Sequence, residues 1–302
     1  MEFRHLRAFV ALAETLHFGR AAERLHLSQP PLSRQIRQLE TLLGVKLFTR
    51  STQRVALTEA GRAFLPEART ALAQVERAMR AARASGRGEE HRLEIGYLAT
   101  IDHGPVAQII SAFRTEHPRT AIALSHMVSL EQIAALRDGR IDIGFVRLPL
   151  AHRGLACLTI DRHPFVAVLP ATHRLARGKR IDLAELSDEE FITIAAHMHP
   201  TFHAVMLGVC RAAGFTPRIV HESEQLQNVV VMVASGLGIG LVPASVAAFK
   251  TPGVVFQALK GTPGEVTVES AVLWRPHDPS PIVAEFVACV RNYLASRTAT
   301  PN

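Results

Sequence analysis

The sequence is poor in the features that mark disulfide scaffolds and membrane proteins. It has only three cysteines in 302 residues, Cys157, Cys210 and Cys289, which are far apart and odd in number. Neither a disulfide framework nor a paired-cysteine metal site is therefore expected. No apolar run reaches the roughly 18 residues that a membrane span needs. The opening residues, MEFRHLRAFVALAE, carry charges and no small-residue cleavage site, so we do not expect a signal peptide. The few scattered cysteines favour a reducing cytoplasm.

The sequence also lacks the common catalytic motifs. It contains neither HExxH nor GxSxG, and SGLGIG has neither the GxGxxG order nor the lysine of a phosphate-binding loop. Fifteen histidines leave a metalloenzyme as an alternative, because HMHPTFH places His199 and His203 four residues apart. A zinc site needs a further ligand, and none is indicated. We therefore predict no metal, no cofactor and no enzymatic activity.

Positive charge is concentrated in the first third of the chain. Residues 1–87 contain 15 basic and 7 acidic residues, a net charge of +8, whereas the remainder carries a net charge of −1. A basic segment joined to a neutral body suggests a module that binds a polyanion and a second module that senses or catalyses. A soluble protein with a basic surface is the alternative.

Helical periodicity divides the first 57 residues into three short helices. Apolar residues recur at helical spacing over 3–16, and a second helix follows the interruption at Gly19, over RAAERLHL. Ser28 is a good N-cap for a third helix, which Gly44 ends. The segment VKLFTRSTQRVALT then indicates two short strands around a basic tip, Arg50 to Arg54. The pattern predicts a winged helix-turn-helix domain over residues 1–57.

The third helix begins with two prolines, Pro30 and Pro31, within HLSQPPLSRQIRQLE. First-turn N–H groups have no partner inside a helix, so the prolines remove no ladder hydrogen bond there. A helix-turn-helix presents its second helix to the DNA major groove. The polar face of the helix after Ser28 would then meet DNA.

A long helix follows, starting at Thr58. A heptad seam runs along it in steps of three and four residues, through Leu65, Ala68, Leu72, Val75, Met79 and Ala82. Packing on its own domain is the alternative to dimerisation, and Pro66 should kink or perturb the helix. SGRGEE, residues 85–90, indicates a linker. We assign residues 58–90 to a dimerisation helix and hinge.

Strand-like and helical segments alternate from Leu93 onward. The strand-like segments are LEIGYLA, IALSHM, IDIGFV, PFVAVL, FITIA, RIVHES, IGLVP and EVTVESAVLW. The alternation predicts an α/β domain with mostly parallel sheets. About 210 residues is large for one such unit, so two Rossmann-like subdomains with a cleft are expected. We place subdomain I at about 91–162 and 268–302, and subdomain II at about 163–267.

The first 65 residues closely resemble the LysR-type transcriptional regulators. The resemblance rests on AAERLHLSQPPLSRQIRQLETLLGVKLFTR followed by LTEAG, and GRIDIGFVR and EQLQNVVVMVASGLGIGLVPASVAA extend it over nearly the whole chain. Gly19-Arg20 and Pro66 depart from the pattern. The variant SQPPLSRQI most resembles the branch that controls catabolism of catechol, chlorocatechol and benzoate. The resemblance implies an effector domain like a periplasmic binding protein, muconate-like or aromatic acid effectors, and a tetramer built as a dimer of dimers.

The DNA-binding residues follow from the exposed face of the third helix and from the wing. Arg34 can reach a guanine edge or a phosphate, Gln29 and Ser33 can bond base edges, and the two prolines can touch a thymine methyl. A solvated face is an equal alternative for Arg37. The predicted set is Ser28, Gln29, Pro30, Pro31, Ser33, Arg34, Arg37, Arg50 and Arg54.

The effector-binding residues are predicted at the ends of strands in the α/β domain. Thr100 and Ser129 each follow a strand and precede a helix, where they act as N-caps or hold a carboxylate, and Arg147 supplies a counter-charge. The resemblance adds Pro200, Thr201 and Phe202 as the opposing wall, and Leu226 begins a helix facing the cleft. Effector binding would reorient the subdomains and alter DNA bending and contact with RNA polymerase. A solute-binding protein would share the cleft but not the helix-turn-helix.

Overall fold

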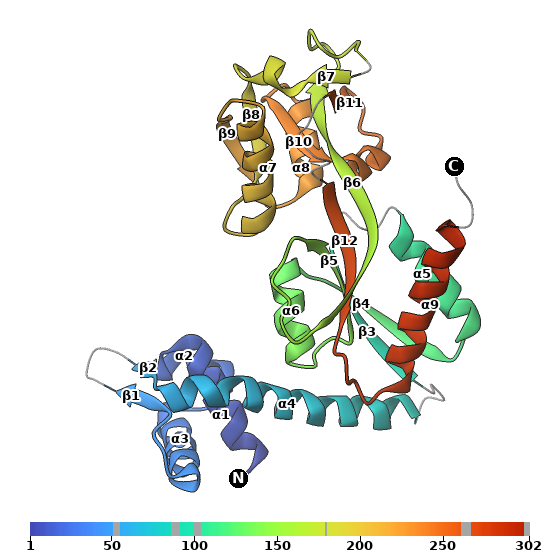
Figure 1. The fold of residues 1–302 in the computed structure, drawn as a ribbon. Coiled ribbons are helices and arrows are strands. Elements are labelled where there is room, and N and C mark those ends of the chain that lie inside the picture. Colours follow the sequence, from blue (N-terminus) through green and yellow to red (C-terminus); the bar gives the residue numbers. More distant parts are fainter. Residues whose placement is uncertain (51–54, 86–90, 99–103, 179, 261–266, 299–302) are drawn as a thin grey trace. The chain divides into compact units, whose positions relative to one another are not determined.

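The computed structural model describes residues 1–302 except 51–54, 86–90, 99–103, 179, 261–266 and 299–302 (Figure 1). The chain forms two compact units. The N-terminal unit comprises residues 1–90 with 137–140, and the C-terminal unit comprises residues 91–136 and 141–302. Among the described residues, no helix combines the length and hydropathy that a membrane crossing requires.

The N-terminal unit contains the expected three helices, two-stranded wing and long helix. Its elements are α1 (Phe3–Thr15), α2 (Phe18–Arg24), α3 (Gln29–Leu43), β1 (Phe48–Arg50), β2 (Val55–Leu57) and α4 (Glu59–Ser85). One apolar core joins them, with Phe9, Leu12, Leu32, Ile36 and Leu39 fully buried. Burial of each such side chain contributes about 1.5–3 kcal/mol to the free energy of unfolding. The apolar residues that recur at helical spacing in the sequence therefore form this core.

The start of α2 differs from the sequence prediction. Gly19 does not interrupt the chain before the helix but lies inside its first turn, because α2 begins at Phe18. The ring of His17 caps the helix, its Nδ1 atom accepting the backbone N–H groups of Gly19 at 3.1 Å and Arg20 at 3.3 Å. This cap satisfies first-turn donors in the way a Ser or Asp side chain usually does.

Helix α3 begins and ends where the sequence predicts. Ser28 is the N-cap residue, although its side chain makes no cap hydrogen bond, and Pro30 and Pro31 lie in the first turn. Gly44 ends the helix with φ 69°, in the left-handed region that glycine adopts without strain. The two prolines therefore remove no hydrogen bond from the helix.

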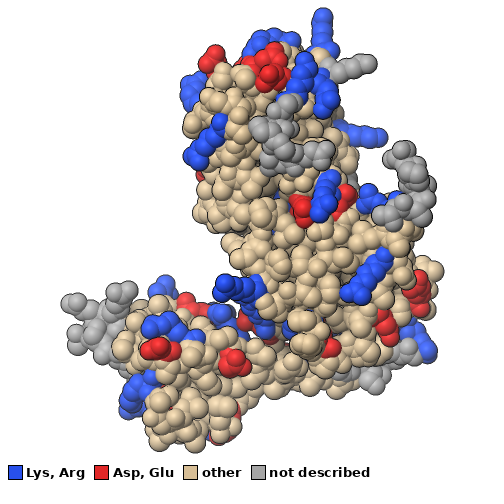
Figure 2. All heavy atoms as spheres, viewed as in Figure 1, with Lys and Arg blue, Asp and Glu red and all other residues tan. Residues whose placement is uncertain are grey.

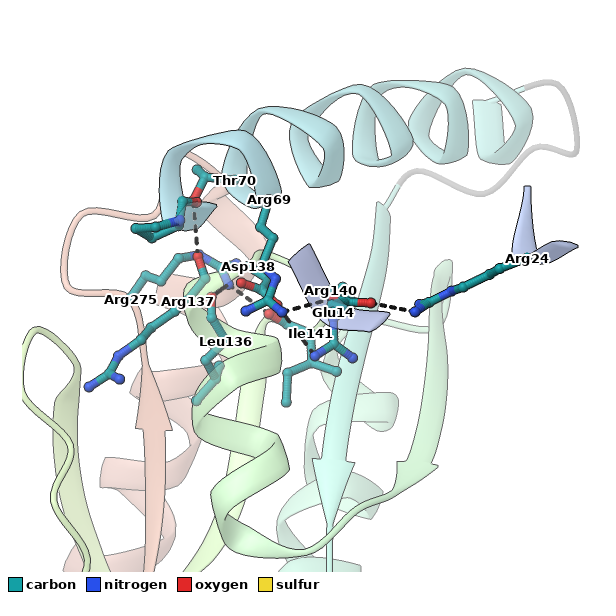
Figure 3. Close-up of polar contacts among 11 residues, drawn as sticks. Glu14, Arg24, Arg69, Thr70, Leu136, Arg137, Asp138, Arg140, Ile141 and Arg275 are labelled. Carbon is teal, nitrogen blue, oxygen red and sulfur yellow. Dashed lines mark hydrogen bonds and ion pairs between the residues drawn. The ribbon is translucent and has the colours of Figure 1, made fainter. Parts of the chain in front are cut away.

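Three helices of the N-terminal unit meet at one carboxylate. Glu14 of α1 pairs with Arg24 of α2 at 2.5 Å and with Arg69 of α4 at 2.8 Å (Figure 3). The arginines approach different carboxylate oxygens, so both pairs form at once. Partly exposed pairs of this kind contribute about 0.2–1 kcal/mol each, and here they tie α2 and α4 to α1.

The predicted seam of α4 divides into two parts. Leu65, Ala68 and Leu72 pack on the core of the N-terminal unit. Val75 and Met79 are 43% and 48% exposed. The helix continues through Pro66 without a break. The exposed part of the seam is the part available to another chain.

The C-terminal unit is built from strands and helices along a continuous sheet path. Its elements are β3 (His91–Tyr97), α5 (Pro105–Glu116), β4 (Thr120–His126), α6 (Ser129–Arg137), β5 (Ile143–Leu148), β6 (Ala156–Pro170), β7 (Arg180–Asp182), η1 (Leu183–Leu186), β8 (Glu190–Ile194), α7 (Pro200–Ala212), β9 (Arg218–Ser223), α8 (Leu226–Ala234), β10 (Ile239–Pro243), η2 (Ala244–Phe249), β11 (Val254–Lys260), β12 (Thr267–Trp274) and α9 (Pro281–Thr298).

Strand β6 joins two lobes of the C-terminal unit, as Figure 1 shows. Residues 156–164 pair with β12, and residues 165–170 pair with β10 and β11. Among the described strands of this unit, five of the nine pairings are parallel, in line with the expectation of mostly parallel sheets. The sheet is nevertheless mixed, because β6 and β12 run antiparallel to all their neighbours. The sequence analysis also missed β7, β11 and the first half of β6.

The base of the turn after α6 is held by one arginine. Arg275 donates through Nη1 to the carbonyl oxygens of Leu136 at 2.6 Å and Ile141 at 2.7 Å (Figure 3). Its Nη2 atom pairs with Asp142 at 2.9 Å. These charge-assisted bonds connect the end of β12 to the segment between α6 and β5.

Candidate functional site

The solvent-facing side of α3 carries most of the predicted DNA-binding residues. Ser28, Gln29, Pro30, Arg34 and Arg37 are exposed. Pro31 and Ser33 are half-buried, and Arg37 donates to the Ser33 hydroxyl oxygen at 3.1 Å. The opposite side of the helix is buried in the core. The structure therefore brings these side chains together on one surface, which we call the α3 surface. The described structure includes the backbone of Arg50 in β1, whereas its side chain and all of Arg54 lie outside it.

A buried histidine connects the α3 surface to the start of α1. His5 Nδ1 accepts the backbone N–H of Glu2 at 3.0 Å, so the ring proton of the neutral imidazole is on Nε2. Nε2 lies 3.2 Å from Oε1 of Gln38, which accepts that proton. This bond orients the Gln38 amide. Sequence analysis missed His5 because a lone histidine in an apolar helix carries no distinctive signal.

A groove of about 650 Å³ lies along this part of the unit. Three arginines line it, Arg4 from α1 and Arg34 and Arg37 from α3, together with Pro30 and Gln38. Arginines set along a groove provide fork-shaped donors for phosphate oxygens and guanine edges. On the face of this unit that Figure 2 shows, basic side chains are interspersed with acidic ones.

The wing is attached to α3 by a buried carboxylate. Glu40 has a side chain that is 1% exposed, and its Oε1 atom accepts the N–H groups of Leu47 at 3.0 Å and Phe48 at 3.3 Å. Its Oε2 atom lies 3.3 Å from the ammonium of Lys46. The carboxylate thus sets the position of β1 relative to α3.

Two adjoining cavities in the C-terminal unit collect most of the predicted effector-binding residues. The main cavity has a volume of about 190 Å³, and the side cavity has a volume of about 30 Å³. Arg147, Met198 and His199 line both. Leu226 lines the main cavity, and Ser129, Pro200, Thr201 and Phe202 line the side cavity. Thr100 lies outside the described residues.

Arg147 supplies a positive charge at the junction of the two cavities. It lies in β5, and its Nε atom is buried. Burial lowers the pKa of the guanidinium to about 10, so the group is still protonated at neutral pH. The guanidinium lies over the ring of Phe202 in α7, 5.8 Å from its centroid. A buried guanidinium at a cavity is well placed to bind a carboxylate.

The hydroxyl of Ser129 bonds the backbone of β5. Ser129 is the first residue of α6 and is buried, and its hydroxyl oxygen accepts the backbone N–H of Arg147 at 3.1 Å. Ser129 therefore holds the backbone from which Arg147 projects. The sequence left two roles open for this hydroxyl, capping α6 or holding a carboxylate, and carboxylate binding stays a prediction.

The histidines around α7 have separate surroundings. His203 Nδ1 lies 3.1 Å from the carbonyl oxygen of Ile194. Within the described residues, no group of three or more His, Cys, Asp and Glu side chains is placed to hold a metal ion. His199 instead lines both cavities, a position that sequence analysis did not assign to it.

Two family models cover almost the whole chain. Residues 3–62 match the bacterial regulatory helix-turn-helix protein, lysR family, and residues 86–295 match the LysR substrate binding domain. The chain belongs to the LysR family of transcriptional regulators. As a member of this family it is a DNA-binding regulator with an effector-binding domain, and not an enzyme.

Relatives resemble this LysR-family regulator over its full length. The HTH-type transcriptional regulator AlsR of Bacillus subtilis (strain 168) is 36% identical, covering 99% of this chain and 98% of AlsR. The Hca operon transcriptional activator HcaR of Escherichia coli (strain K12) is 35% identical, covering 99% and 100%. The crystal structure of CbnR, a LysR family transcriptional regulator, matches with a TM-score of 0.69 at 34% identity, covering 97% of this chain and 99% of CbnR. CbnR has also been solved at full length with its target DNA, and that structure matches with a TM-score of 0.68.

Proposed function

We propose that this regulator responds to a small carboxylic acid, an aromatic carboxylate or a muconate-like dicarboxylate, bound in the main and side cavities. The observation that carries the proposal is the buried guanidinium of Arg147 at their junction. Phe202 lies against the guanidinium, and Leu226 lines the main cavity. A buried cation beside apolar walls selects a ligand with an anionic end and an apolar body. The aromatic-catabolism branch named above has effectors of this kind.

In this proposal, Arg147 binds the carboxylate, and the other residues shape the site. Ser129 holds the Arg147 backbone, and Phe202 holds the guanidinium in place. Pro200 and Thr201 line the side cavity on the α7 side. Thr100 remains a proposed ligand from the sequence. Binding then shifts the balance between arrangements of the two lobes joined by β6 and β12.

The same proposal assigns promoter DNA to residues 1–57. Arg34, Gln29 and Ser33 would read base edges, and Arg50 and Arg54 of the wing would contact the backbone or minor groove. Residues 58–90 would join two chains through α4, and residues 91–302 would hold the effector. The exposed apolar side chains of Val75 and Met79 support this role of α4 in joining two chains. We also propose that the regulator works in the cytoplasm as a tetramer, a dimer of dimers, and contacts RNA polymerase.

The function is tested by selection followed by footprinting. Duplexes that the full chain selects from a random pool are footprinted with and without benzoate and cis,cis-muconate. The proposal predicts a protected site whose length or cleavage pattern changes with at least one of these acids. Failure to select any sequence contradicts the DNA role, and an unchanged footprint with every acid tested contradicts the effector role.

A further inference from the structure

Arg147 and His199 line the same two cavities, although they belong to different secondary-structure elements. Arg147 projects from β5, whereas His199 immediately precedes α7. Both side chains line the main cavity and the side cavity. The ring of His199 is half-buried and hydrogen-bonds the backbone of Glu224 in the segment before α8. A ligand bound at the guanidinium would therefore lie close to this imidazole.

The charge of His199 depends on what lies at Arg147. Burial first, and then the positive charge of Arg147, lower the pKa of His199, while its bond to the Glu224 backbone acts in the opposite direction. The imidazole is therefore neutral at neutral pH, and Arg147 supplies the positive charge of this pair.

The remaining ionisable groups around the main cavity are more exposed than His199. They are His126 of β4, Glu131 of α6 and the side chain of Glu224. The carboxylate of Glu131 also accepts the N–H of Val128 at 3.3 Å. Exposed charges are screened by water and salt, so they affect the His199 ring less than the buried guanidinium does.

A carboxylate that binds Arg147 favours the protonated form of His199. Its negative charge cancels the field of the guanidinium and directly favours the imidazolium. Any group whose pKa rises when a ligand binds takes up protons during binding, and by linkage a proton then strengthens ligand binding.

We propose that His199 is a second anion-recognition residue, which takes up one proton from solvent when a carboxylate binds Arg147. The inference rests on the proposed function. The free cavity then carries one positive charge on this pair of residues, and the occupied cavity carries two against the negative charge of the acid. Affinity for the acid increases as pH falls, by up to tenfold per pH unit between the free and bound pKa values of His199. The protonated ring supplies a second charge-assisted donor, which an uncharged analogue of the acid does not recruit.

The test is calorimetric titration of the full chain with benzoate and with cis,cis-muconate, each in phosphate and in Tris at pH 7. The difference in apparent enthalpy between the two buffers gives the number of protons taken up. Wild type should take up a measurable fraction of a proton, and His199→Gln should take up none and lose the pH dependence of affinity. The control His221→Gln, which changes an exposed histidine of β9 outside both cavities, should retain the uptake.

Each outcome supports or contradicts one part of the account. Acid binding without proton uptake at any pH between 6 and 8, or with the same uptake in His199→Gln, overturns the role of His199 and leaves the proposed function intact. If neither acid binds wild type, the proposed function fails, and the role of His199 fails with it. If His199→Gln does not fold, histidine ring NMR of wild type decides the matter. The proposal then requires that one histidine ring titrates at higher pH with acid than without it. If every ring titrates at the same pH in both samples, the proposal is overturned.

Discussion

The carboxylate of Glu40 in α3 accepts the backbone N–H of Leu47 at 3.0 Å, at the entrance to the wing. The same oxygen accepts the N–H of Phe48 at 3.3 Å. A buried carboxylate that bonds two backbone donors fixes two elements relative to each other. In this regulator it connects the helix that carries Arg34 to the strand that carries Arg50.

Replacing Glu40 is therefore expected to destabilise the N-terminal unit. Glu40→Ala leaves two buried N–H groups without this acceptor and should lower the free energy of unfolding by about 2–4 kcal/mol. Glu40→Gln retains an acceptor oxygen and should lower it less. The side chain of Lys46 is 76% exposed, so Lys46→Ala should change stability by less than about 1 kcal/mol. Urea denaturation of residues 1–90 or of the full chain measures all three, and equal losses for Lys46→Ala and Glu40→Ala would contradict this role.

Arg34 is the residue expected to carry sequence preference. Arg34→Ala should abolish the preference of the regulator for its selected duplex over a scrambled duplex while leaving the fold intact. A bidentate arginine–guanine contact contributes about 1–3 kcal/mol of discrimination. Fluorescence anisotropy against both duplexes at fixed salt gives the ratio, and circular dichroism checks the fold. Arg211→Ala, which removes an exposed arginine of α7, is the matched control. An unchanged ratio in Arg34→Ala would exclude the assigned role.

The exposed part of the α4 seam predicts how chains associate. Val75→Glu would place a charge at an apolar contact in both chains. It should weaken self-association at least tenfold, because each buried Val contributes about 1.5–3 kcal/mol. Gln74→Glu adds the same charge one residue away from the seam and should leave association unchanged. Sedimentation velocity over a range of concentrations compares the two. Equal behaviour of the two variants would rule out a dimer through this part of α4.

Burial predicts that one thiol in particular is unreactive. Burial raises the pKa of the Cys210 thiol to about 12, and it also raises the pKa of Cys157 and Cys289. At pH 8 only about one Cys210 thiol in ten thousand is then ionised, and the thiolate is the reactive form. Iodoacetamide should therefore modify Cys210 far more slowly than a free thiol, and denaturant should abolish the difference. Mass spectrometry of the native protein follows the reaction, and modification at the rate of a free cysteine would contradict this burial.

The elements with a strong local signal were predictable, and those set by tertiary pairing were not. The 3.6-residue period and the cap positions predicted α3 from Ser28 to Gly44, because burial and capping both depend on residues that are close in the sequence. The first half of β6 and all of β11 were missed, since they pair with strands far away in the sequence. At the site, Arg147 was predicted from its place after an apolar strand. The roles of Ser129, His199 and Glu40 needed the structure, because each depends on a backbone group brought close by the fold.

The central claim is that Arg147 binds the carboxylate of the effector, and acid binding by two variants tests it most directly. Isothermal titration of wild type, Arg147→Lys and Arg147→Gln with benzoate and cis,cis-muconate gives the three affinities for each acid. The account predicts binding by wild type, weaker binding by Arg147→Lys, which keeps the charge but loses the fork of donors, and none by Arg147→Gln. Anisotropy with the selected duplex should show unchanged DNA binding by Arg147→Gln without acid. Binding of either acid by Arg147→Gln with the wild-type affinity would contradict the account.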